Sequence, residues 1–163
     1  MSGWRAALQS GLKVALGVAA ALISPSVALV QEAANLELLS KDDARAIFAM
    51  TRAEWAENVR RAVATGAARA TGKSESGGVT MVTTTQAGEL FVRPDYSDEG
   101  RPDFILVTVG YRSPPAELLS DASLNDAIEL AKRQMEPEYE VTGRVERLEA
   151  GAAVFFTIME KDR

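Results

Sequence analysis

Residues 104–111 read FILVTVGY, and this stretch carries the strongest strand signal in the chain. β-Branched and aromatic residues dominate it, as is typical of strands. Its apolar positions show neither the 3.6-residue spacing of an amphipathic helix nor a regular polar alternation. A continuous apolar run of this kind predicts a central strand that is covered on both faces. Residues 154–159, VFFTIM, have the same character and predict a second strongly apolar strand.

Weaker strand signals flank these two segments. The two-residue periodicity of strands is present at 79–85, 90–93 and 139–147. Short connections that contain Gly or Pro separate most of the consecutive strands, and strands joined in this way pair antiparallel. We therefore expect a single antiparallel sheet of about five strands.

Helix signals precede the first strand. Ser40 with Asp43, and Thr51 with Glu54, have the spacing of helix N-terminal capping boxes. The apolar positions keep one helical phase across 41–65, which favours a single helix, whereas the second box favours two. We expect two helices in this region.

A third capping box, from Ser123 to Asp126, predicts a helix that extends to about Met135. The expected order of elements is α-α-β-β-β-α-β-β, which belongs to the α+β class with helices packed on the sheet. Residues 66–78 are small, polar and rich in glycine. They predict a flexible linker between the second helix and the first strand.

The N-terminal segment has the three parts of a secretory signal peptide. Arg5 and Lys13 supply positive charge, residues 14–23 are apolar, and small residues precede a cleavage point after Ala28. The ten residues of the apolar core fall well short of the roughly 20 needed to cross a bilayer. An uncleaved N-terminal anchor and a buried helix of the domain are the alternatives.

This interpretation divides the chain into three parts. Residues 1–28 form the predicted signal peptide, residues 29–39 a lead-in, and residues 40–163 a single α+β domain. A chain with such a signal is periplasmic or secreted. We expect it to meet a membrane only transiently, through the signal peptide.

The composition excludes several chemistries. The chain contains neither cysteine nor histidine, so it has no disulfide, no thiol nucleophile, no Cys/His zinc site and no imidazole catalyst. The formal net charge of −5 gives no cationic surface for general binding to nucleic acid. We therefore predict no catalytic residue, no cofactor, no metal and no nucleic-acid partner.

Two acidic clusters are the strongest candidates for chemistry. In the loop 95–103, Asp95, Ser97 and Glu99 fall at the first three ligand positions of an EF-hand calcium loop, but Leu106 stands where that loop needs a glutamate. We interpret this loop as a solvated turn. Glu136, Glu138 and Glu140 could supply a carboxylate pair for hydrolysis, but alternation along this segment favours a charged strand edge.

These observations favour an exported, non-enzymatic interaction or accessory domain of the bacterial cell envelope, with an unidentified protein partner. One alternative is a carrier of a small apolar ligand, held between the sheet and the helix 124–135. Its lining would be Phe104, Leu106, Met135 and Phe156. A pocket of several hundred Å³ would favour the carrier. A carboxylate-based hydrolase is the other alternative, and the sequence indicates no oligomeric state.

Overall fold

The computed structural model describes residues 39–73, 78–84, 88–98, 100–112 and 120–161. The predicted signal peptide and nearly all of the lead-in lie outside these ranges. Within them the chain forms α3 (Lys41–Phe48), α4 (Arg52–Ala64), β1 (Arg69–Lys73), β2 (Val79–Thr84), β3 (Gly88–Asp95), β4 (Phe104–Arg112), α6 (Asp121–Met135), β5 (Tyr139–Leu148) and β6 (Gly151–Glu160). In this part of the chain, no helix has both the length and the apolar character needed to span a membrane.

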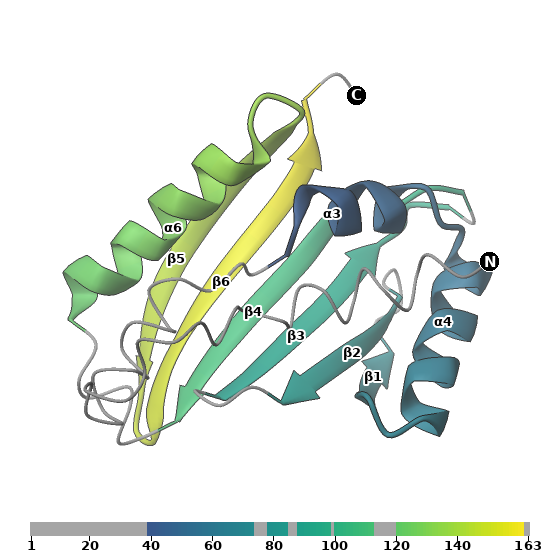
Figure 1. Ribbon diagram of the computed structural model, residues 1–163, viewed down its shortest axis with the longest axis horizontal. Coiled ribbons are helices and arrows are strands. Elements are labelled where there is room, and N and C mark those ends of the chain that lie inside the picture. Colours follow the sequence, from purple (N-terminus) through teal and green to yellow (C-terminus); the bar gives the residue numbers. More distant parts are fainter. Residues whose placement is uncertain (1–38, 74–77, 85–87, 99, 113–119, 162–163) are drawn as a thin grey trace, which may run out of the picture.

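The strands form one antiparallel sheet in the order β1-β2-β3-β4-β6-β5 (Figure 1). The α+β class and the single antiparallel sheet predicted from the sequence are confirmed. The two strongly apolar segments become strands β4 and β6, as their character predicted, and the structure pairs them with each other. The hairpin of β5 and β6 folds back so that β6 pairs with β4, which leaves β5 at the edge.

The sheet has six strands rather than about five, because the predicted linker 66–78 contains a strand. Residues Arg69–Lys73 form β1, which pairs with β2 at the edge of the sheet. The sequence RATGK has little strand propensity of its own. The hydrogen-bonding edge that β2 offers decides the conformation here, and this tertiary information is invisible in local sequence.

Two separate helices occupy the region 41–65, as expected. The Ser40 hydroxyl accepts a hydrogen bond from the Asp43 amide at 3.1 Å and so begins α3. A complete capping box of Thr51 and Glu54 begins α4, and the Thr51 amide donates to the Glu54 carboxylate at 2.8 Å. The backbone and hydroxyl of Thr51 lower the pKa of Glu54 by hydrogen bonding to its charged form.

The third helix begins earlier than the sequence predicted. The N-cap of α6 is Ser120, whose hydroxyl accepts from the Ser123 amide at 3.1 Å. The expected cap, Ser123, instead lies inside the first turn. Both serines are suitable caps, and the local sequence does not distinguish them.

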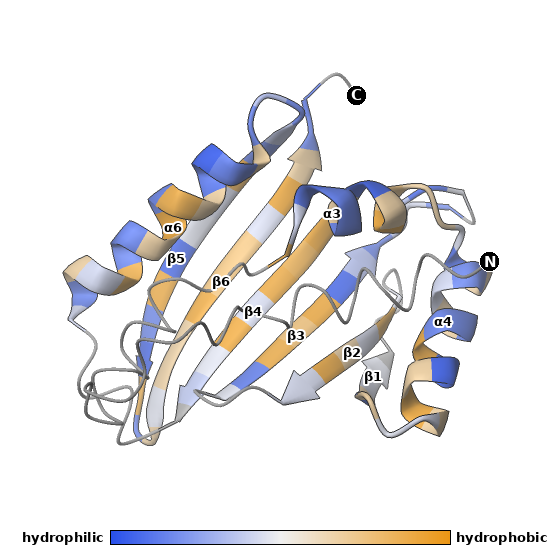
Figure 2. Cartoon of the chain, in the orientation of Figure 1, coloured by the Kyte–Doolittle hydropathy of each residue, from blue (hydrophilic) through white to orange (hydrophobic). Residues whose placement is uncertain are grey.

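All three described helices pack on the same face of the sheet and share one hydrophobic core. Figure 2 shows the side of α4 toward the strands as apolar and its outer side as hydrophilic. Gly143 of β5 permits the close approach of α6, because a Cβ there would lie only 2.8 Å from Ile128 Cγ2. The largest fully buried side chains of this core include Trp55, Phe48, Ile47, Ile105 and Leu124.

The three tyrosines of the chain, Tyr96, Tyr111 and Tyr139, are all buried in or beside this core. Burial raises the pKa of Tyr96 and of Tyr111 to about 12, and it also raises the pKa of Tyr139. A tyrosine whose pKa is higher in the folded state than its unfolded value near 10 makes its full contribution to stability below pH 10. That stability is lost as the pH rises through the folded pKa.

We therefore expect the urea midpoint to fall between about pH 10 and 12, with the phenolate absorbance of the native protein titrating well above the usual tyrosine value. Ultraviolet titration at constant helical circular dichroism measures this directly. Phenolate absorbance rising near pH 10, while the protein stays folded, would contradict the assigned burial.

Candidate functional site

The face of the sheet opposite the helices carries the candidate site. In β4, the odd-numbered residues Ile105, Val107 and Val109 point into the core and are buried. The alternate residues therefore point to the other face, and Leu106 and Thr108 are only half-buried there. We call this second side of the sheet the open face. The sequence predicts that β4 is covered on both faces. The described helices all lie on one side of the sheet, so they cover only one face of β4.

A hollow of about 580 Å³ lies on the open face. It extends over strands β1 to β6, and its lining combines apolar, hydroxyl and cationic groups. These lining residues are Thr71, Thr80, Phe91, Arg93, Leu106, Thr108, Arg144, Phe155, Phe156 and Thr157.

The strand register arranges the open-face residues in rows across the sheet. In one row Phe91 lies opposite Thr108, Thr108 opposite Phe155, and Phe155 opposite Arg144. Side chains of directly opposite residues lie about 5 Å apart and interact. The row therefore places two aromatic rings around a threonine, with a guanidinium at its β5 end.

The adjacent row contains the second guanidinium. Arg93 lies opposite Leu106, and Leu106 lies opposite Thr157. Leu106 is therefore the apolar residue next to Arg93 in the floor of the hollow. Together the two rows form an apolar floor between two cationic positions, Arg93 on β3 and Arg144 on β5.

Each of these arginines keeps hydrogen-bonding capacity. A terminal nitrogen of Arg93 is 3.8 Å from the Asp95 carboxylate, and one of Arg144 is 3.6 Å from that of Glu146. Both distances exceed hydrogen-bond length. The Arg93 Nε is buried and has no hydrogen-bond partner among the described residues. The Arg144 guanidinium also covers the Phe155 ring at 4.5 Å from its centroid.

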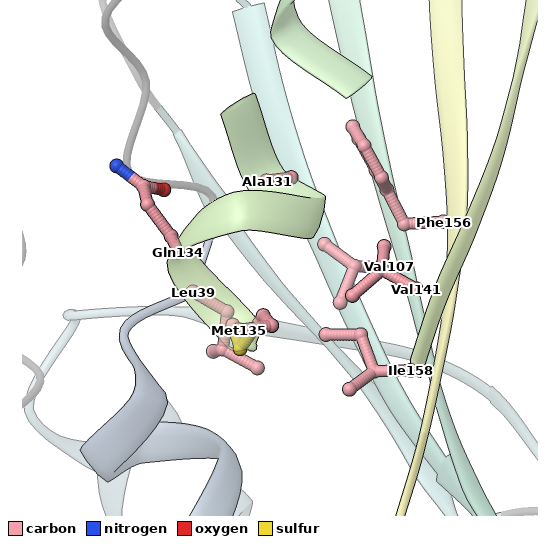
Figure 3. Close-up of a pocket in the computed structure, with 8 residues that line it drawn as sticks. All are labelled: Leu39, Val107, Ala131, Gln134, Met135, Val141, Phe156 and Ile158. Carbon is pink, nitrogen blue, oxygen red and sulfur yellow. The ribbon is translucent and has the colours of Figure 1, made fainter. Parts of the chain in front are cut away.

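The four residues predicted to line a ligand site are not all together. Met135 and Phe156 both line the small space between α6 and the sheet, together with Val107 and Ile158 (Figure 3). Leu106 lines the hollow on the open face. Phe156, on the neighbouring strand β6, also borders this hollow. Phe104 is half-buried at the start of β4, opposite Asp95.

The space between α6 and the sheet is almost filled. It holds about 10 Å³, close to the volume that a single water requires. Ligand sites for small molecules measure roughly 300–1,000 Å³. A ligand of that size fits the open face and has no room beneath α6.

Eight of the ten residues that line the hollow are not predicted as site residues by the sequence, among them Phe91, Phe155, Arg93 and Arg144. The available signal was the apolar character of both alternating positions in β4 and β6. One set of positions fills the core, so the other set must place large apolar residues on the opposite face.

The other sequence candidates have structural roles or no assembled site. Trp55 is a core residue, since it is fully buried and its Nε1–H donates to the Val79 carbonyl at 2.7 Å. Glu138 pairs with Arg45 at 2.8 Å, and this hydrogen bond lowers the pKa of Glu138. Among the described residues, no group of acids is arranged to hold a metal ion.

Comparison of the chain with protein-family models, curated proteins and solved structures found no match. The fold and the site define an α+β protein with one antiparallel sheet, covered by helices on one face and hollowed on the other.

Proposed function

We propose that this chain is an exported, non-enzymatic accessory domain that binds a protein partner through the open face of its sheet. The observation that carries this proposal is the apolar floor of the hollow, formed by Phe91, Leu106 and Phe155. An antiparallel sheet with one covered face ordinarily places polar residues on the other face. Large apolar residues gathered on an open face are typical of a binding surface.

The electrostatics support binding rather than catalysis. The hollow is lined by threonines, arginines and apolar residues, and no carboxylate lines it. The carboxyl groups of Glu54 and Glu138 have lowered pKa values, whereas a general acid at neutral pH needs a raised one. Both of these glutamates stabilise local structure, at a helix N-terminus and between α3 and β5.

Export is supported by the signal-peptide pattern of residues 1–28.

A second candidate function is a carrier of a small, largely apolar ligand. The volume of the hollow, about 580 Å³, favours it, because this lies within the range of small-molecule sites. In this version the ligand occupies the open face rather than the space beneath α6.

Site-specific photo-crosslinking in the producing cells tests the protein-partner proposal. A photoreactive phenylalanine analogue in place of Phe155 is expected to yield one discrete protein adduct. The same analogue in place of Arg133, an exposed residue of α6, is the matched control and is expected to yield none. Adding Phe91→Lys to the Phe155 probe should reduce the adduct at least several-fold. Identical adducts from both positions, or none from Phe155, would contradict a partner on the open face.

A further inference from the structure

We propose that the hollow on the open face binds an amphipathic carboxylic acid, with its apolar chain over Phe91, Leu106 and Phe155 and its carboxylate on Arg93. This inference rests on the carrier form of the proposed function and names the chemical class of the ligand.

The charge of the hollow selects an anion. The chain as a whole is acidic, with 23 Asp and Glu against 18 Lys and Arg. The lining of the hollow contains two arginines and no acid, and the carboxylates within 4 Å of these arginines, on Asp95 and Glu146, stand beside the lining. A local cationic site in an acidic protein attracts an anionic ligand and disfavours a cationic one.

Arg93 is the residue suited to hold the carboxylate. Its buried Nε has no partner among the described residues, and its nearest carboxylate oxygen, on Asp95, lies beyond hydrogen-bond distance. The Nε itself is covered by protein, but the side chain as a whole is 32% exposed, so a ligand would meet the guanidinium at its terminal nitrogens. The planar guanidinium matches a carboxylate with two parallel hydrogen bonds, which a lysine cannot make.

The floor of the hollow suits an extended apolar chain. Strands β3, β4, β6 and β5 are consecutive neighbours in the sheet. At about 4.8 Å between neighbouring strands, Arg93 on β3 and a residue on β5 stand about 14 Å apart along the sheet. Leu106 and Phe155 lie on the two strands between them. An alkyl chain that crosses these strands diagonally from Arg93 passes over Leu106 and then Phe155, with Thr157 beside its path.

Calorimetric titration with three probes that share one alkyl chain tests the inference on the full chain. Dodecanoate, dodecanol and dodecyltrimethylammonium are compared below the micelle concentrations of the two ionic probes and below the solubility limit of dodecanol. We expect dodecanoate to bind, and the neutral and cationic probes to bind at least roughly tenfold more weakly, because a charge-assisted hydrogen bond is lost.

Substitutions locate the binding site. Arg93→Met is expected to weaken dodecanoate binding about tenfold or more and to leave dodecanol binding unchanged. Arg133→Met, on the exposed surface of α6, removes the same charge elsewhere and should change neither affinity. Arg93→Lys keeps the charge beside Asp95, so it provides the test if the methionine variant does not fold. It should weaken dodecanoate binding several-fold, because the two parallel hydrogen bonds are lost.

Three results would overturn the inference: no binding of dodecanoate, equal affinity for the three probes, or equal losses in the Arg93→Met and Arg133→Met proteins. These outcomes are separable from failure of the protein-partner proposal. A discrete crosslink from position 155 without dodecanoate binding would support the protein-partner proposal and contradict the ligand proposal. Dodecanoate binding that depends on Arg93, without a crosslink, would support the ligand proposal and contradict the protein-partner proposal.

Discussion

Replacing Trp55 with alanine is expected to lower the free energy of unfolding by about 3–5 kcal/mol. Trp55 is fully buried in the core between α4 and the β2 end of the sheet. Its Nε1–H donates to the Val79 carbonyl at 2.7 Å. The backbone at Gly78 packs directly against the indole, because a Cβ at that position would lie 2.8 Å from Trp55 Cδ1. The substitution therefore creates a cavity and removes a buried hydrogen bond together.

Urea unfolding followed by circular dichroism measures this loss. Trp55→Phe keeps most of the packing and removes the indole donor, so an intermediate loss of about 1–3 kcal/mol is expected. Val63→Ala, at an exposed position of the same helix, should change stability by less than about 0.5 kcal/mol. A loss for Trp55→Ala as small as that for Val63→Ala would show that the tryptophan is not in the core.

The adjacent residues Phe155 and Phe156 are expected to respond differently to the same substitution. Phe156→Ala should cost about 3–5 kcal/mol, because this side chain is 3% exposed and packs beneath α6. Phe155→Ala should cost about 1–2 kcal/mol, because Phe155 is half-buried on the open face and loses only partial burial and its contact with Arg144.

Each phenylalanine serves as the control for the other, since they differ by one position in the same strand. Urea midpoints at equal protein concentration provide the comparison. Equal losses, or a larger loss for Phe155, would mean that β6 pairs in a register shifted by one residue. Such a shift would exchange the two faces of the strand and move the candidate site to the helix side.

The candidate site illustrates what sequence reasoning could reach. Leu106 was identified as a ligand-lining residue, and it lines the hollow. The sequence groups it with Met135 and Phe156, which line a small space on the helix side of the sheet. The grouping failed because β4 and β6 are apolar at both alternating positions. Alternation assigns residues of one strand to two faces, but it does not say which face of one strand joins which face of the next.

The sequence by itself determined the elements with strong local signals. The capping boxes at Ser40 and Thr51 specified two helices, because their side chains satisfy free amides within the same turn. The apolar runs 104–111 and 154–159 specified the two central strands, because they are dominated by β-branched and aromatic residues and lack the spacing of an amphipathic helix.

Only the tertiary structure decided the sixth strand and the face that each residue occupies. Arg69–Lys73 becomes a strand because β2 offers it a hydrogen-bonding edge. Leu106 and Phe155 reach the open face because the pairing of β4 with β6 and the packing of the helices assign Val107 and Phe156 to the core. Strand register and the choice of buried face depend on contacts between residues distant in sequence, which a local pattern with a period of two residues does not encode.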